Sequence, residues 1–346
     1  MYEADVLLLA AGFGSRLRPL TLRIPKALLP IYGIPLLDYH LARLFEPGPA
    51  HDGQDHPRVP LPAPMARRVV VNGHHLADMV SQHLDRHPFG ERTVFSFEEQ
   101  ILGTGGAIRQ AAAFLETDPF VVLNADILFP APVEAAIAAH MDSGHLITMI
   151  LTPSPLNPNV VVRDGRIVDI LRDRTSPTAM TYTGCQVVSR RTLGLLPSDG
   201  FHDIRDTYRA LIQEQLLGVY ICPPDKALLD VGTPACYLKT HEQCAGEGAR
   251  RYDLRIDPQD RGGTTAEGYG YVDASARIGD GASIRESVIL PRAWVGDGVC
   301  VERSIIGPDV RVDQTACNVL ITLDGSLPID ATYPPATHQS GGQHES

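Results

Sequence analysis

Short apolar runs alternate with amphipathic segments over most of the first 245 residues. Four of these runs have the length and composition of buried strands: residues 6–9, 69–71, 120–123 and 146–151. One segment between them repeats apolar residues at the i, i+3, i+4, i+7 spacing of a helix with one buried face, at Ile108, Ala111, Ala112 and Leu115. Strands that alternate with helices predict an α/β sheet whose faces are covered by helices.

A different pattern begins near residue 265, where similar segments recur 17 residues apart. IGDG at 278–281 returns as VGDG at 295–298, and ESVI at 286–289 returns as RSII at 303–306. The same offset links three apolar rows: Val272, Ile289 and Ile306; Ile278, Val295 and Val312; and Ile284 with Val301. Rows spaced about six residues apart, each giving one inward residue per side, predict a short parallel β-helix of hexapeptide type. Two hairpins with Gly-Asp-Gly turns are the alternative interpretation.

The two patterns divide the chain into two domains, as its length of 346 residues leads us to expect. The α/β pattern covers residues 1–245, and the β-helix pattern covers residues 265–325. Residues 45–67 are rich in Pro, Gly, His and Asp without periodicity, which predicts a surface insertion within the first domain. Residues 326–346 are rich in Pro, Ser, Gly and His, which predicts a flexible tail.

The charge balance limits the classes of partner. The chain has 30 Lys and Arg against 41 Asp and Glu, a formal net charge of −11, which argues against nucleic-acid binding through a basic face. An anionic ligand must therefore be bound by local cations. The apolar runs stay well short of the roughly 18 residues of a membrane span, and the N-terminus enters a strand without the layout of a signal peptide. These features predict a cytoplasmic protein with no membrane partner.

Cysteine and histidine spacings give little support for a zinc or disulfide framework. Six cysteines are scattered without a Cys-x-x-Cys pair, so we expect reduced thiols. Cys300 and Cys317 are one 17-residue repeat apart and are predicted to stack as free thiols on adjacent coils of the β-helix. His74 and His75 have no third ligand nearby in the sequence and are interpreted as loop histidines.

A glycine-rich loop with two arginines follows the first predicted strand, at residues 8–21 (LLAAGFGSRLRPLT). A dinucleotide-binding loop would have its third glycine where this chain has Leu17, and the Gly-Lys-Ser/Thr of a P-loop is absent. Small residues at 10–14 let the backbone approach a ligand and offer N–H donors to phosphate oxygens. Arg16 and Lys26 bring cations to the same place. The loop is therefore predicted to hold a triphosphate.

The spacing of residues 9–21, followed by PKALLP at 25–30, closely resembles the signature of the sugar-1-phosphate nucleotidylyltransferases. Further segments are similar to that family in the same order: IPLLDYHL at 34–41, LGTGGA at 102–107, FVVLNAD at 120–126 and LDVGTP at 229–234. The resemblance implies a Rossmann-like nucleotidyltransferase domain with a mixed sheet, followed by a left-handed β-helix. It also implies transfer of a nucleotidyl group from an NTP to a sugar 1-phosphate, with release of pyrophosphate.

Roles for individual residues follow from the same resemblance. The implied catalytic residues are Arg16, Lys26, Asp126 and Asp230, with Mg²⁺ held by the two aspartates. The implied nucleotide-binding residues are Leu9, Ala10, Ala11, Gly12, Gly14, Ser15, Arg16, Gln100, Gly103 and Gly105. The residues implied for the sugar phosphate are Asn124, Asn159, Tyr182 and Gly184. Positioning and charge neutralisation would then carry the reaction without a protein nucleophile.

The chain also departs from the family pattern. A Glu-Lys pair that holds the sugar and its phosphate in many relatives is missing after residues 165–170. Arg172 or Arg174 is the candidate replacement for the lysine, and a solvated loop is the alternative interpretation of these two arginines. Asn159 stands where a glycine is common. The α/β domain most resembles N-acetylmuramate-1-phosphate uridylyltransferases, whereas the β-helix resembles that of mannose-1-phosphate guanylyltransferases. The nucleotide is therefore expected to be UTP or GTP.

Two other classes of function compete with this interpretation. An acyltransferase acting through the coils would need a catalytic histidine between them, and residues 265–325 contain none. A catalytically inactive, nucleotide-sugar-binding regulatory protein would be expected to have lost Arg16, Lys26 or one of the aspartates, and all four are present. The β-helix is predicted to mediate homo-oligomer assembly or regulation, because a short stack leaves exposed edges.

Overall fold

The computed structural model describes residues 3–45, 66–154, 157–170, 178–222, 228–245 and 266–329. Most of the predicted insertion at 45–67 and of the predicted tail at 326–346 therefore lies outside the described residues. Arg172 and Arg174, the candidates for the missing lysine, lie outside them as well.

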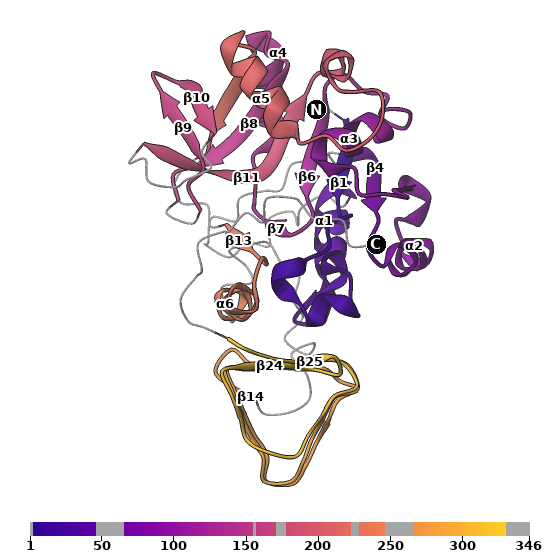
Figure 1. The fold of residues 1–346 in the computed structure, drawn as a ribbon, viewed down its shortest axis with the longest axis vertical. Coiled ribbons are helices and arrows are strands. Elements are labelled where there is room, and N and C mark those ends of the chain that lie inside the picture. Colours follow the sequence, from indigo (N-terminus) through magenta and orange to yellow (C-terminus); the bar gives the residue numbers. More distant parts are fainter. Residues whose placement is uncertain are drawn as a thin grey trace, which may run out of the picture.

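The first domain is built around a mixed sheet of nine strands (Figure 1). Its strands are β1 (Ala4–Leu9), β4 (Ala66–Gly73), β5 (Thr93–Phe97), β6 (Phe120–Asn124), β8 (Ile147–Thr152), β9 (Val160–Arg163), β10 (Arg166–Ile170), β11 (Ala179–Val188) and β12 (Leu217–Ile221). The order is β10-β9-β11-β6-β1-β4-β5, and β8 pairs with both β11 and β12. β1 is parallel to β4 and β6, whereas β11 is antiparallel to β6, β8 and β9. The predicted α/β class with a mixed sheet is confirmed.

Helices cover both faces of this sheet. They are α1 (Leu36–Phe45), α2 (Ala77–Arg86), α3 (Gly103–Ala111), α4 (Val133–Ser143), α5 (Ile204–Gln213) and, beyond the sheet, α6 (Pro234–Cys244). In β1, Val6 and Leu8 pack with α1, α2 and α4 in one core, whereas Leu7 packs with α3 and α5 in the other. Alternate residues of a strand point to opposite faces, so a sheet buried on both sides requires the continuous apolar run that the sequence has.

Shorter elements surround the carboxyl ends of the parallel strands. Those after β1 are the 3₁₀ helices η1 (Ser15–Leu17), η2 (Leu20–Leu22) and η3 (Lys26–Leu28), and the hairpin of β2 (Pro30–Ile31) and β3 (Ile34–Pro35). Two more 3₁₀ helices lie farther along the chain, η4 (Gly90–Arg92) and η5 (Arg190–Leu195). A two-residue ladder joins β7 (Ile127–Leu128) to β13 (Leu229–Asp230), and it ties the start of the segment before α6 to the end of β6.

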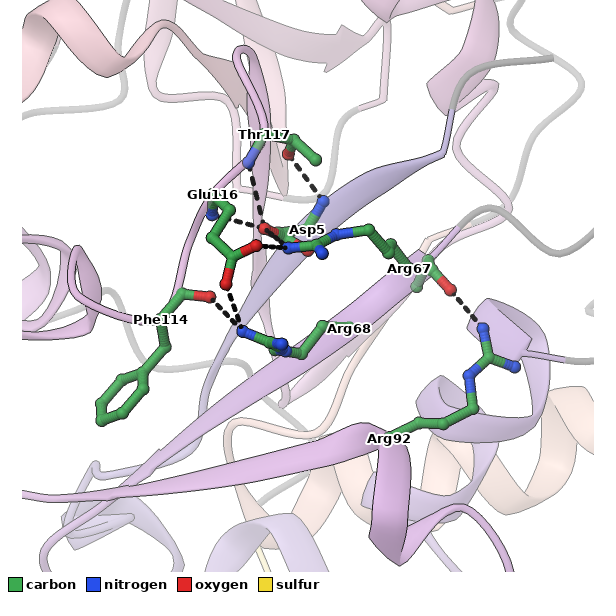
Figure 2. Close-up of polar contacts among 8 residues, drawn as sticks. Asp5, Arg67, Arg68, Arg92, Phe114, Glu116 and Thr117 are labelled. Atoms are coloured by element: carbon green, nitrogen blue, oxygen red, sulfur yellow. Dashed lines mark hydrogen bonds and ion pairs between the residues drawn. The ribbon is translucent and has the colours of Figure 1, made fainter.

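Asp5 is the centre of a polar network near the amino ends of β1 and β4 (Figure 2). Its carboxylate is fully buried and accepts two hydrogen bonds of 3.0 Å from Arg67, and one each from the amides of Glu116 and Thr117, at 2.5 and 3.1 Å. Glu116 also pairs with Arg67 at 2.8 Å and with Arg68 at 3.0 Å. Burial by itself would raise the pKa of Asp5, but the hydrogen bonds and the Arg67 charge outweigh it and lower the pKa. This edge of the sheet is closed by paired charges.

The C-terminal part forms a triangular coil of parallel strands (Figure 1). One side contains β14 (Ala266–Glu267), β17 (Ser283–Arg285), β20 (Cys300–Glu302) and β23 (Ala316–Cys317). The second contains β15 (Tyr271–Val272), β18 (Val288–Ile289), β21 (Ile305–Ile306) and β24 (Val319–Thr322), and the third β16 (Arg277–Ile278), β19 (Trp294–Val295) and β22 (Arg311–Val312). The predicted apolar rows share one core inside the coil. The parallel β-helix is confirmed, while its left hand stays a prediction.

The last coil departs from the 17-residue repeat. Val301 pairs with Ala316, which is 15 residues farther along the chain. The connection between β22 and β23 is shorter than the one between β19 and β20, so Cys317 lies opposite Glu302 and not opposite Cys300. The predicted stacking of the two cysteines is therefore wrong. All six cysteines are free thiols, as expected.

An antiparallel strand ends the coil. β25 (Gly325–Pro328) pairs with β24, and the amide of Ile329 donates to the carbonyl of Asn318 at 2.7 Å. This hairpin covers the edge of the last coil, which would otherwise present unpaired backbone groups. Paired backbone thus continues to residue 329, past the predicted boundary at 325.

One side of the coil packs against the α/β domain. The two share an apolar core to which the coil contributes Tyr271, Val288, Ile305 and Leu320, and the α/β domain Ile31, Tyr32, Tyr237 and Leu238. Arg23, which follows the signature loop, forms an ion pair with Asp324 at the tip of the β24–β25 hairpin. The two N–O distances are 2.5 and 2.9 Å. This side of the coil is buried within its own chain and is not free to contact a second subunit. Homo-oligomer assembly stays a prediction.

Candidate active site

The carboxyl ends of β1, β4 and β6 open onto a cleft of about 300 Å³. Its lining comes from the signature loop, from η3 and from the segments that follow β4, β5 and β6: Leu9, Ala10, Ala11, Gly12, Lys26, Ala27, Asn72, Glu98, Ile101, Gly103, Thr104, Asn124, Ala125 and Asp126. Ligands of α/β sheets bind at this edge, where loops after neighbouring strands converge. The fold thus brings Lys26 and Asp126, 100 residues apart in sequence, into the same cleft as the signature loop.

The signature loop depends on a left-handed turn at Gly14. Its φ is +59°, and an added Cβ would lie 2.8 Å from Cγ2 of Thr21, so a side chain would be both strained and obstructed. The Thr21 hydroxyl donates to the Gly14 carbonyl at 2.9 Å and holds the turn closed. At Gly12, by contrast, an added Cβ would meet no heavy atom within 4 Å. The loop is anchored at Gly14 and leaves room for a ligand at Gly12.

Asn72 and Glu98 connect the two loops that line the cleft. Oδ1 of Asn72 accepts the Ala10 amide at 2.6 Å, and its Nδ2 donates to Oε1 of Glu98 at 2.6 Å. The second oxygen of Glu98, which is 1% exposed, accepts the amide of Leu102 at 3.0 Å. Sequence reasoning missed both residues. Asn72 directly follows the predicted strand at 69–71, and Glu98 directly follows β5. These positions were the available signal, because loops at the carboxyl edge of such a sheet bind ligands.

Lys26 and Asp126 form an ion pair in the cleft. Their side chains are 12% and 32% exposed, so the charges are partly desolvated but still accessible. Burial would raise the pKa of Asp126, but the charge and hydrogen bond of Lys26 and the charge of Arg16 lower it below its usual value. Asp126 is therefore ionised at neutral pH and can serve as an oxygen ligand.

Pairing of β7 with β13 brings Asp230 beside the end of β6. The amide of Val231 donates to the carbonyl of Asp126 at 3.1 Å, which joins the two aspartate-bearing segments. An added Cβ at Gly232 would lie 2.8 Å from Oδ1 of Asp230 and 3.0 Å from Nη2 of Arg16. Both charged groups therefore approach the backbone of Gly232, where only glycine leaves them space.

The aspartates fit Mg²⁺ by the chemistry of their donors. Asp126 and Asp230 offer carboxylate oxygens from neighbouring segments, and Mg²⁺ prefers oxygen ligands and takes one or two carboxylates in phosphate-binding sites. Lys26 and Arg16 lie close enough to offset part of the negative charge when no metal is bound.

A second, smaller cavity of about 40 Å³ shares Asn124 with the cleft and also contains Gly184. These are two of the residues predicted to contact the sugar phosphate. His40 lines the same cavity; burial, and secondarily the charge of Arg43, lower its pKa to about 4, so the ring is neutral at pH 7. Its Nε2 then donates to the carbonyl of Ala125 at 3.2 Å, which supports the peptide next to Asp126.

The other two predicted sugar residues do not line either cavity. Asn159 accepts the amide of Tyr182 through its side-chain oxygen at 3.1 Å, and so it bridges β9 and β11. The Tyr182 hydroxyl shares a hydrogen bond with Tyr208, and burial raises its pKa well above the usual value. The ring is partly buried and packs against the core between the sheet and α5.

Five predicted nucleotide-binding residues also lie outside the lining of the cleft: Gly14, Ser15, Arg16, Gln100 and Gly105. Gly105 donates its amide to the carbonyl of His202 at 3.0 Å, and an added Cβ would lie 2.2 Å from the His202 ring. This glycine is required by the close approach of the segment before α5. Gly103 lines the cleft and also lies close to His202. A Cβ added at Gly103 would be 2.7 Å from the carbonyl oxygen of His202.

Comparison with known families agrees with this geometry. Residues 6–169 match the model of the MobA-like NTP transferase domain. The first half of the chain is thus similar to a nucleotidyltransferase domain. This match contains the signature loop, Lys26 and Asp126, and it ends before Asp230.

Individual relatives extend the similarity. Mannose-1-phosphate guanylyltransferase of Mycobacterium tuberculosis is 26% identical over 69% of this chain and 64% of its own length, so this chain matches less than two thirds of that protein. A putative mannose-1-phosphate guanyltransferase of Sulfolobus acidocaldarius is 28% identical over 82% of this chain and 75% of its own. Among solved structures, HddC from Yersinia pseudotuberculosis complexed with GMP-PN has a TM-score of 0.53 at 20% identity, over 68% of this chain and 97% of that one, and shares the fold. No helix in the described part of this chain is long and apolar enough to cross a membrane.

Proposed function

We propose that the protein transfers a nucleotidyl group from GTP or UTP to a sugar 1-phosphate and releases pyrophosphate. The observation that carries the proposal is the arrangement of Lys26, Asp126, Arg16 and Asp230 beside a cleft walled by the signature loop. The names of the relatives support a sugar phosphate as acceptor. GTP with mannose 1-phosphate is the first pair to test, because two relatives carry that activity in their names and the HddC structure contains GMP-PN.

In the proposed reaction an oxygen of the sugar phosphate attacks the α-phosphorus of the NTP. A new P–O bond forms as the bond to the pyrophosphate oxygen breaks, and the electron pair leaves with pyrophosphate. Arg16 and Lys26 would offset the negative charge that builds up on the departing and transferred phosphates. Mg²⁺ held by Asp126 and Asp230 would polarise the phosphate and orient it for in-line attack.

The two cavities suggest how this chain would orient its substrates. The open backbone at Gly12 and the cleft residues from α3 would receive the nucleotide. The smaller cavity, which contains Gly184 and shares Asn124 with the cleft, would receive part of the sugar phosphate. Holding both phosphates beside the same carboxylate converts the reaction into an intramolecular one, which is the main source of rate when no protein nucleophile takes part.

A panel assay of pyrophosphate release tests the proposal. Purified protein is incubated with Mg²⁺ and each combination of four NTPs and several sugar 1-phosphates, and we expect release that needs both substrates and is lost in EDTA. Lys26→Ala should lower this activity about 10²-fold, whereas Lys239→Ala, at an exposed position on α6, should keep it. Binding of an NTP without turnover of any pair would instead favour the inactive regulatory protein.

A further inference from the structure

A cluster of three metal-ligating side chains lies between helices α1 and α2, and none of its residues lines the cleft. Asp38 is in the first turn of α1, His83 is in the last turn of α2, and His87 follows α2 directly. One potential ligand atom from each lies within 4.8 Å of the other two. Their side chains are 22%, 26% and 10% exposed, so the cluster is half-buried and open to solvent on one side.

We propose that Asp38, His83 and His87 bind one divalent transition-metal ion of the zinc type, which links α1 to the end of α2. Three protein ligands with a solvent molecule in the fourth position make a four-coordinate site. Two imidazoles and one carboxylate favour Zn²⁺ or Co²⁺ over Mg²⁺, which takes oxygen ligands. This ion is therefore distinct in kind from the Mg²⁺ of the cleft.

The distances suit a metal-free form of such a site. Nε2 of His87 is 3.7 Å from Oδ1 of Asp38, close to the separation of about 3.3 Å that two ligands have around a tetrahedral ion with bonds of about 2.0 Å. Nε2 of His83 is 2.5 Å from the same oxygen, within hydrogen-bond distance. An ion bound here would replace this hydrogen bond and would separate the two atoms to the ligand–ligand distance given above.

The imidazole rings are held in place by their neighbours. The His87 ring lies between the rings of His83 and Phe89, at centroid distances of 5.8 and 5.5 Å, and Phe89 in turn packs against Phe45 at the end of α1. Nδ1 of His87 accepts the amide of Phe89 at 3.2 Å. Metal binding through Nε2 moves the remaining ring proton to Nδ1 and gives up this long hydrogen bond. The ring orientation itself is preserved by the aromatic contacts.

Titration with Co²⁺ tests the proposal without any turnover assay. Full-length protein freed of metal with EDTA is titrated with Co²⁺ in excess Mg²⁺, which occupies the cleft carboxylates, and visible absorption is recorded. We expect one equivalent of Co²⁺ to bind with intense d–d bands of a low-coordinate ion, and Zn²⁺ to displace it. His83→Gln, His87→Gln and Asp38→Asn should each bind Co²⁺ at least about tenfold more weakly, because each removes a ligand.

Two control variants separate this site from others. Asp126→Asn changes the cleft and His145→Gln removes a histidine at the amino end of β8, and both should bind Co²⁺ as the wild type does. As a second readout, Zn²⁺ should raise the Tm of the wild type but not of His87→Gln, since binding to the folded state alone is stabilising. Absence of a stoichiometric Co²⁺ spectrum in the wild type, or an unchanged spectrum in the histidine variants, overturns the proposal. Neither result bears on nucleotidyl transfer.

Discussion

The two edges of the parallel strands carry similar charges in opposite settings. Near the amino ends, Asp5 accepts four hydrogen bonds, two from Arg67 and two from backbone amides, and has no exposed surface (Figure 2). At the carboxyl ends, Asp126 pairs with Lys26 beside an open cleft and keeps 32% of its side chain exposed. An aspartate with a basic partner and a lowered pKa occurs at both edges. Access for a ligand, rather than charge or pKa, distinguishes the pair proposed to act in catalysis from the structural pair.

The difference has a topological cause. Loops after parallel strands converge at the carboxyl edge and leave a crevice between them, whereas the opposite edge is filled by the chain segments that enter the strands. The segment before β6 places the amides of Glu116 and Thr117 directly on Asp5. At the other edge, small residues of the signature loop leave the space beside Asp126 open. Substitutions at the two edges should therefore affect different measurable properties.

The largest expected effect is at Asp126. Asp126→Asn keeps the size of the side chain but removes the charge that a divalent ion and Lys26 require, so we expect kcat to fall on the order of 10³-fold, or about 4 kcal/mol in the barrier. Asp230→Asn should behave similarly. The measurement is pyrophosphate release at saturating Mg²⁺, with circular dichroism to show that the variants are folded. Full wild-type turnover in EDTA would contradict the metal assignment.

A smaller loss is expected at the basic partner. Lys26→Ala removes one charge-assisted contact to a polyphosphate, so kcat/KM should fall about 10²-fold, while Mg²⁺ dependence remains. Arg16→Ala should have an effect of the same order. Steady-state kinetics with Lys239→Ala as the exposed-lysine control provides the comparison. A Lys26→Ala enzyme with unchanged kcat/KM would assign the ion pair to structure, like the pair at Asp5.

At the opposite edge the affected property is stability. Asp5→Asn puts an amide group against donors from Arg67, Glu116 and Thr117, so we expect the free energy of unfolding to fall by about 2–4 kcal/mol. Urea denaturation measures this, and the specific activity of the folded variant should match the wild type. A loss of activity without a loss of stability would reverse the contrast between the edges.

Acid should remove this stabilisation selectively. Because the folded pKa of Asp5 lies below its ordinary value of 3.8, its carboxylate stabilises the fold above about pH 4, and this contribution is lost as the pH falls through the folded pKa. The gap in unfolding free energy between wild type and Asp5→Asn should therefore be full at pH 7 and shrink at pH 3. A gap that stays constant with pH would mean that shape, not charge, accounts for the loss.

The smallest effect is expected at Glu116, in the same network as Asp5. Its side chain is 57% exposed, so solvent screens its pairs with Arg67 and Arg68. Glu116→Gln should leave the Tm and the activity unchanged within experimental error. A measurable drop in Tm would show that Arg67 needs this carboxylate to stay in position against Asp5.

Much of the fold could be predicted from local pattern. The apolar runs correctly predicted β1, β4, β6 and β8, because a strand covered on both faces must be apolar throughout. The repeats after residue 265 predicted the parallel coil, since each coil must place its apolar residues over those of the one before. The last coil failed the same reasoning, because a shorter connection between β22 and β23 shifted the register and separated Cys317 from Cys300. The prediction depended only on the apolar rows, and the length of a connection can change while those rows remain.

The candidate site divides in the same way. The sequence by itself determined the position of the signature loop and the identity of its cations, because residues within one short segment stay close together in any fold. Only the tertiary structure decided which distant residues meet it: β7–β13 pairing brings Asp230 beside Asp126, and Asn72 with Glu98 fastens two loops together. It also packed Tyr182 against the core and placed Asp38 beside two histidines at the end of another helix. These outcomes depend on contacts between residues far apart in the chain, which local spacing does not encode.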